Sequence, residues 1–143
     1  MRIFSSAIIF KILCWTIAAI FILAGAEKIS NPAKFAQDIN NYRLLPYFLV
    51  AVTAIILPWL EMICGLFLIL NFRRLGATFI LLLLSFIFLL AISSALLRGL
   101  DITCGCFALS EQATRISYFH LWEDIILLAA NLLIYFRTIK TRT

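Results

Sequence analysis

Two cysteines separated by a single glycine, Cys104-Gly105-Cys106, are the clearest sign of chemistry in this sequence. A disulfide between residues this close is strained, because its two Cα atoms must lie within roughly 4.4–6.8 Å of each other. The glycine relaxes the backbone restriction that would otherwise resist such a ring. Because a strained, exposed disulfide is easier to reduce than a structural one, the motif favours a redox-active pair in which Cys104 and Cys106 are the catalytic residues.

Two other interpretations of this motif stay open. The two thiolates could contact copper(I) or zinc, but further ligands are scarce nearby and we predict no metal site. Alternatively, the cysteines pair with a partner protein or have no chemical role. The remaining cysteines, Cys14 and Cys64, lie in apolar stretches. We interpret them as small buried hydrophobic side chains, the alternative being a second thiol pair that receives electrons.

Glu61 is the most costly polar residue of the sequence, because it falls near the middle of a long apolar stretch. A carboxylate at mid-bilayer must be paired, protonated or turned towards a polar cavity. Lys28 and Arg98, which we expect just beyond the outer ends of two apolar stretches, are candidate counter-charges. Glu61, Lys28 and Arg98 are then either linked to proton uptake or form an ion-pair network that holds the helices together.

A second polar group lies in the last apolar stretch. His120, Asp124, Asn131 and Tyr135 fall on one face of a helix, with Glu123 beside them. We expect His120, Glu123 and Asp124 near the outer surface, within reach of the same counter-charges. As for Glu61, a proton-linked role and a structural role are both open.

The elements that position these residues are helices in a membrane. Of 143 residues, 64% are hydrophobic and 13% charged, and the mean hydropathy is +1.08. A soluble domain is closer to half apolar and a quarter charged. A membrane-spanning helix needs about 20 apolar residues, and four stretches qualify, approximately residues 4–26, 47–72, 75–97 and 118–136. We therefore predict an all-α, single-domain protein over residues 1–143, an antiparallel four-helix transmembrane bundle.

The basic residues predict its orientation in a prokaryotic inner membrane. Seven lie at the ends we assign to the cytoplasm, Arg2, Lys11, Arg73, Arg74, Arg137, Lys140 and Arg142, against five at the other side. Both termini would then be cytoplasmic, and the loop with the cysteine pair extracytoplasmic, where the environment is oxidising. A rival interpretation makes the first stretch a signal peptide that is cleaved after Ala24-Gly25-Ala26.

Local signals predict three further features. Asn31 as N-cap and Pro32 at the first helical position start a short helix in the first outer loop. Phe35, Ile39 and Tyr42 would give it an apolar stripe on the membrane surface, although a plain loop is an equal alternative. Pro58 should kink the second long helix, and Gly65 should let a neighbouring helix approach closely.

Several of these motifs together resemble the MauE proteins of methylamine utilisation, within the wider DoxX-like membrane family. The resemblance rests on Gly25-Ala26-Glu27-Lys28, Asn31-Pro32, Tyr42-Arg43-Leu44-Leu45-Pro46, Leu57-Pro58-Trp59-Leu60-Glu61, Arg98-Gly99 and Cys104-Gly105-Cys106-Phe107. Two departures stand out. Ala108 replaces a frequent glycine, and Glu123 stands where a basic residue often precedes the aspartate, which puts a family role for Asp124 in doubt.

The resemblance implies a four-helix membrane protein associated with thiol redox chemistry outside the cytoplasm, supporting maturation of an exported protein alongside a thioredoxin-like partner. On this view the chain is a thiol–disulfide oxidoreductase. A quinone is the candidate electron acceptor, and Trp59, Phe107 and Trp122 are candidates to line its site, although interfacial aromatic residues are usually anchors. The alternative is a non-enzymatic accessory subunit of a membrane redox complex. We expect no nucleic-acid partner, and oligomers are compatible with the sequence.

Overall fold

The computed structural model describes the backbone of residues 2–99 and 118–141, and side chains over 7–99 and 121–141. All regular structure in these ranges is helical. The helices are α1 (Arg2–Ser30), α2 (Pro32–Asn41), α3 (Tyr47–Ile69), α4 (Arg74–Leu97) and α5 (Tyr118–Lys140). The four long helices agree with the predicted stretches to within about four residues at each end.

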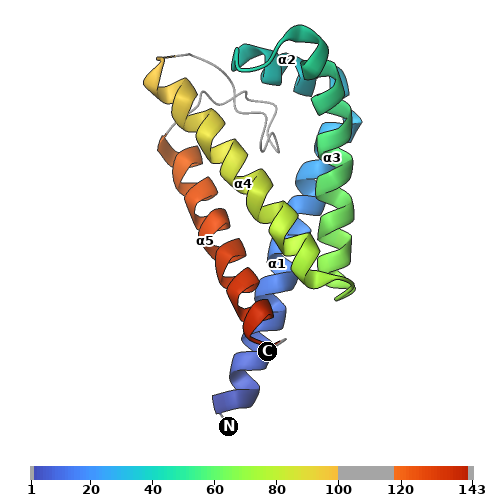
Figure 1. The fold of residues 1–143 in the computed structure, drawn as a ribbon, viewed down its shortest axis with the longest axis vertical. Coiled ribbons are helices and arrows are strands. Elements are labelled where there is room, and N and C mark those ends of the chain that lie inside the picture. The colour runs from blue at the N-terminus through green and yellow to red at the C-terminus, as the bar shows by residue number, and fades with distance from the viewer. Residues whose placement is uncertain (1, 100–117, 142–143) are drawn as a thin grey trace.

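The long helices are arranged as two pairs. α1 packs along α3, α4 packs along α5, and the pairs meet through contacts of α3 with α4 and of α1 with α5. Figure 1 shows that the pairs approach each other near the chain termini and diverge towards the end where α2 crosses. Cys14 and Cys64 are buried in the core between them, in agreement with their interpretation as packing residues.

The outer surface of these helices is that of a membrane protein. Among the described residues, three helical segments are long and apolar enough to cross a bilayer, Ala7–Ser30, Tyr47–Ile69 and Arg74–Leu97. Only 28% to 33% of their most apolar windows is buried inside the protein, so most of this apolar surface needs hydrocarbon as its solvent. α5 is of similar length, 23 residues, but carries charges near both ends, and a fourth crossing stays a prediction.

Close contact between α1 and α3 depends on two glycines. A Cβ added at Gly65 would lie 2.8 Å from Cγ1 of Ile22 and 3.1 Å from the Ala18 carbonyl oxygen. A Cβ added at Gly25 would lie 2.8 Å from the Pro58 carbonyl oxygen. The predicted close approach at Gly65 is thus confirmed, and Gly25 has the same role nearer to α2. α3 runs through Pro58 as a single helix.

The short helix α2 follows the predicted signal. The side chain of Asn31 accepts a hydrogen bond from the Lys34 backbone N–H at 3.2 Å, and Pro32 is the first helical residue. Phe35 is buried, whereas Ile39 is only half-buried. α2 packs on α3 and α1, so its apolar side covers the diverging end of the protein.

Basic residues gather at the opposite end. Figure 1 places both termini there, beside the turn from α3 to α4. The guanidinium groups of Arg74 and Arg137 lie 5.4 and 5.8 Å from the centre of the Phe10 ring. This agrees with the predicted grouping of one set of basic residues at one end, while the side of the membrane that this end faces stays a prediction.

Candidate functional site

A buried ion pair joins α1 to α3 near the α2 end. The Nζ atom of Lys28 donates to both carboxylate oxygens of Glu61, at 2.9 Å to Oε1 and 2.8 Å to Oε2. The two side chains are 5% and 1% exposed. Glu61 is therefore paired, as its position requires. Lys28 was expected beyond the helix end, but α1 continues to Ser30, since only Asn31 before Pro32 stops it.

Two aromatic rings cover the rest of the Lys28 ammonium group. Its Nζ atom lies 5.3 Å from the ring centre of Phe35 on α2 and 4.9 Å from that of Phe88 on α4. A cation over an aromatic face gains about 2 kcal/mol or more when both are desolvated. Lys28 thus ties together four helices at the diverging end. Sequence reasoning missed Phe88, because nothing local marks it, whereas Phe35 stood out in the stripe of α2.

Asp124 of α5 completes the cluster. It is 7% exposed and lines a cavity of about 20 Å³ together with Lys28, Glu61 and Ser85. Its Oδ2 atom is buried and has no hydrogen-bond partner within the described part of the chain. A space of this size holds about one water molecule. The cluster therefore combines one ammonium and two carboxyl groups, with room for a water or a proton exchange between them.

Further along α5, the predicted polar face is partly confirmed. Asn131 is fully buried, and its Nδ2 atom donates to the Ser85 hydroxyl at 3.3 Å. Tyr135 is half-buried with its ring 6.0 Å from that of Phe79. Glu123 is half-buried beside Asp124. The side chain of His120 lies outside the described residues, so its role stays a prediction.

Arg98 does not serve as a counter-charge for these acids, contrary to expectation. Its Nη1 atom donates to the backbone carbonyl oxygen of Tyr42 at 3.1 Å, in an exposed position. The reason is its place one residue past α4, where it faces the connection between α2 and α3. Arg98 therefore ties that connection to the end of α4.

The cysteine pair and Phe107 lie outside the described residues. The chain leaves α4 after Leu97 and enters α5 at Tyr118. Figure 1 shows both of these helix ends at the same end of the protein as α2. The segment that carries Cys104 and Cys106 is therefore anchored at the end where the charge cluster lies.

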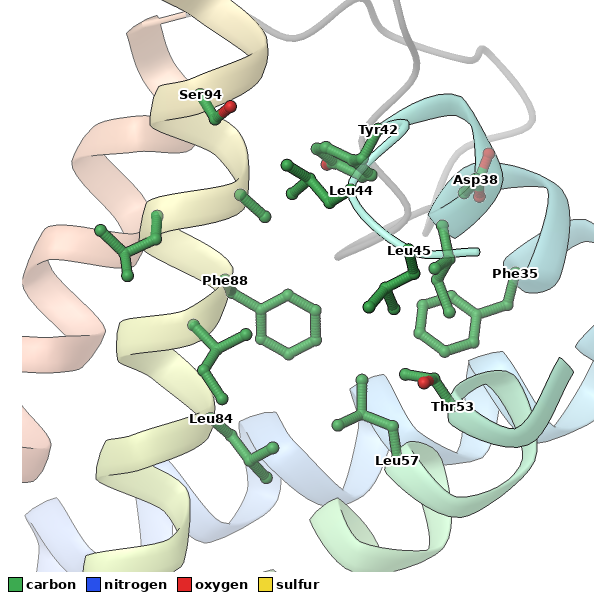
Figure 2. A pocket seen from close by; sticks show the side chains of 14 residues that line it. Phe35, Asp38, Tyr42, Leu44, Leu45, Thr53, Leu57, Leu84, Phe88 and Ser94 are labelled. Atoms are coloured by element: carbon green, nitrogen blue, oxygen red, sulfur yellow. The ribbon is translucent and has the colours of Figure 1, made fainter. Parts of the chain in front are cut away.

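A larger cavity opens between α2, α3 and α4, and sequence reasoning did not anticipate it. Its volume is about 590 Å³ and its wall is almost entirely carbon. Figure 2 shows Phe88 and Leu84 on one side, Phe35 and Leu45 on the other, and Leu57 and Thr53 below. Trp59 and Trp122 are 54% and 64% exposed and are not among the described residues that line it, so their predicted contact with a cofactor stays untested.

Comparison with known proteins identifies the family. The family described as "Methylamine utilisation protein MauE" matches residues 6–137. A curated relative, "Methylamine utilization protein MauE" of Methylophilus methylotrophus, is 33% identical over 117 residues, which are 81% of this chain and 62% of the relative. The chain thus spans about three fifths of that relative's length. No solved structure gives a significant match. Together with the helical membrane architecture, these matches show that the chain belongs to the MauE family.

Proposed function

We propose that this chain is a membrane thiol–disulfide redox protein, which uses Cys104 and Cys106 to support maturation of an exported protein. The observation that carries the proposal is the Cys-Gly-Cys motif in a helical membrane protein. The name of the relative ties that protein to methylamine utilisation. For this chain we infer an accessory role in the maturation of an exported protein. The substrate would be a protein whose cysteine thiols form disulfides.

The chemistry is a two-electron exchange. A thiolate of a thioredoxin-like partner attacks one sulfur of the Cys104–Cys106 disulfide, forming a mixed disulfide and releasing the other cysteine as a thiolate. The second partner thiol then resolves the mixed disulfide. The partner leaves oxidised, and Cys104 and Cys106 are left as a dithiol that holds the two electrons and two protons.

A quinone is the proposed oxidant of this dithiol. Two electrons and two protons pass from Cys104 and Cys106 to the quinone, which becomes a quinol, and the disulfide re-forms. The same steps in reverse would reduce the partner from quinol. For both directions we propose that the motif lies on the extracytoplasmic side of the inner membrane, since disulfides persist there.

The buried charge cluster supports this proposal by linking the two helix pairs. Lys28 contacts Glu61, Phe35 and Phe88 on three other helices, and Asp124 lines the same small cavity. Phe88 of α4 and Asp124 of α5 thereby lie against Lys28 and Glu61 of the other helix pair, below the helix ends that lead into the cysteine segment. Asp124 and Glu61 are also buried carboxyl groups, which we propose could exchange a proton during the reaction.

Replacing Cys104 or Cys106 with serine tests the proposal in cells. We expect the partner's ratio of disulfide to thiol to change strongly in either variant, because a single cysteine cannot complete the exchange. Cys14→Ala is the matched control, since Cys14 is buried in the core and should leave the ratio unchanged.

An unchanged ratio in both serine variants would refute the redox role. If the Cys104→Ser, Cys106→Ser double variant also still captured its partner and complemented a deletion fully, the chain would be a non-enzymatic accessory subunit instead.

A further inference from the structure

The apolar cavity between α2, α3 and α4 has the shape and chemistry of a binding site for a lipophilic ligand. Its volume of about 590 Å³ falls within the range of about 300–1,000 Å³ that is typical of small-molecule sites. Among its lining residues, Leu44, Leu45 and Leu90 are 49%, 39% and 54% exposed. Because these exposed lining residues are apolar and α3 and α4 are membrane-spanning candidates, a ligand would enter from the bilayer.

Two hydroxyl groups on its wall are free to bind a polar head group. At six positions in the described part of the chain, five within helices and one just after α5, a serine or threonine hydroxyl donates to the backbone carbonyl four residues earlier: Thr16, Ser30, Thr78, Ser85, Thr138 and Thr141. Thr53 and Ser94 line the cavity, and their hydroxyl groups make no hydrogen bond within the described part of the chain. Figure 2 shows Thr53 and Ser94 on opposite walls.

Both hydroxyls lie at the end of the protein where the cysteine segment begins. Ser94 is three residues before the end of α4, about 5 Å along the helix axis. Thr53 is six residues after the start of α3, about 9 Å along its axis. The polar part of a bound ligand would therefore lie towards the C-terminal end of α4 and the N-terminal end of α3, with its hydrocarbon part deeper, near Leu57 and Leu84.

The inner wall borders the charge cluster. Phe35 and Phe88 line the cavity, and the same two rings lie against the Lys28 ammonium group. A flat, electron-poor ring could stack on either phenyl ring without exposing the buried ion pair. A site with hydroxyl donors, aromatic faces and a hydrocarbon pocket matches a flat ring with carbonyl acceptors and an apolar chain.

We propose that the cavity between α2, α3 and α4 binds an isoprenoid quinone, with its ring carbonyls towards Thr53 and Ser94 and its chain against Leu57 and Leu84. This inference rests on the proposed function for its redox meaning: the bound quinone accepts two electrons and two protons from the Cys104–Cys106 dithiol and leaves as quinol.

Filling the cavity provides the first test. Full-length protein is purified in detergent, depleted of lipid, and mixed with decylubiquinone, and the bound fraction is measured by native mass spectrometry. We expect one quinone per chain, and at least a tenfold loss of affinity in Ala91→Phe, because Ala91 lines the cavity. Ala51→Phe is the matched control, since Ala51 is exposed on α3 and does not line it.

Removing the hydroxyls separates a quinone from a lipid chain. Thr53→Val with Ser94→Ala should weaken decylubiquinone binding several-fold and leave binding of decylbenzene, which lacks carbonyls, unchanged. Equal binding of both compounds with no effect of the hydroxyls would make this a lipid-chain site and overturn the proposal, as would absence of quinone binding.

A variant that lacks the cysteine pair of the Cys-Gly-Cys motif keeps the two proposals apart. Cys104→Ser, Cys106→Ser protein should bind decylubiquinone as tightly as the native chain. If quinone binds but never oxidises the native dithiol, the thiol chemistry fails and the site stands. If the cysteines cycle in cells but the purified chain binds no quinone, the site fails and the thiol chemistry stands.

Discussion

Lys28 is the residue on which the described contacts of this protein converge. From α1 it reaches Glu61 on α3, Phe35 on α2 and Phe88 on α4. Burying an ion pair costs several kcal/mol for each charge, which the mutual attraction only partly offsets. Such a pair is therefore weak evidence for stability in itself, but losing one partner leaves a buried charge without compensation.

Loss of Lys28 and loss of Glu61 should not destabilise the protein equally. Lys28→Met leaves the carboxyl groups of Glu61 and Asp124 around one small cavity with no cation, and we expect it to destabilise by about 3–5 kcal/mol. Glu61→Gln should cost less, because Asp124 lines the same cavity and still compensates Lys28. Thermal unfolding of the purified variants in detergent measures both.

The double variant Lys28→Met, Glu61→Gln is the control for this asymmetry. Because it removes both charges of the pair, it should be more stable than Lys28→Met alone. Two results would contradict this account. One is a double variant whose loss of stability equals the sum of the two single losses, and the other is an equal loss in the two single variants.

At the scale of elements, local sequence signals predicted where helices begin and end, but not which helix faces are in contact. Asn31 and Pro32 located α2 and, by the same backbone restriction, end α1 at Ser30. Had that restriction been applied to the first helix, Lys28 would have been placed inside it. The ion pair with Glu61 and the ring contact with Phe88 could not be predicted, because they depend on which faces of α1, α3 and α4 meet.

The N-cap of α2 gives a local prediction. Asn31→Ala removes the acceptor for the Lys34 N–H and should cost about 1 kcal/mol of helix stability. Hydrogen exchange at the Lys34 amide should then accelerate about fivefold, because a loss of about 1 kcal/mol raises the equilibrium constant for local opening by about that factor. Asn31→Asp keeps an acceptor and should exchange at nearly the native rate. Equal acceleration in both variants would contradict the cap.

The close contact between α1 and α3 gives a second prediction at the scale of elements. Gly25→Ala would bring a Cβ to 2.8 Å from the Pro58 carbonyl oxygen, a backbone atom that cannot turn aside, and should destabilise by about 1–3 kcal/mol. At Gly76 a new Cβ meets nothing within 4 Å, so Gly76→Ala should stabilise the helix by up to about 1 kcal/mol. Thermal unfolding compares the two. Unchanged stability in Gly25→Ala would show that the helices do not pack so closely.

At the scale of the whole molecule, the four long helices form two pairs, which meet near the chain termini and, within the described residues, diverge towards α2. The composition predicted the membrane setting and the long helices, because apolar length is a property of the sequence alone. The cavity between α2, α3 and α4 could not be predicted in this way, since it arises where the two pairs diverge. The family match covers the chain from residue 6 to 137 and so includes α2, α3 and α4 in full and most of α1 and α5.

The number of crossings is testable at this scale. In a chain whose four native cysteines are replaced, a single cysteine is introduced by Lys34→Cys or Lys140→Cys, both at exposed positions. With α5 as a fourth crossing, a membrane-impermeant maleimide should label Lys34→Cys in intact cells, and Lys140→Cys only after permeabilisation. Labelling of both variants from outside would exclude a crossing by α5.

Thiol trapping of Cys104 and Cys106 in intact cells, read out by mass spectrometry, tests the redox role most directly. A cycling pair predicts a mixture of dithiol and disulfide that shifts towards the dithiol when respiration is blocked, because oxidised quinone then runs short. A pair that stays in one state, whatever the respiratory condition, would contradict that role.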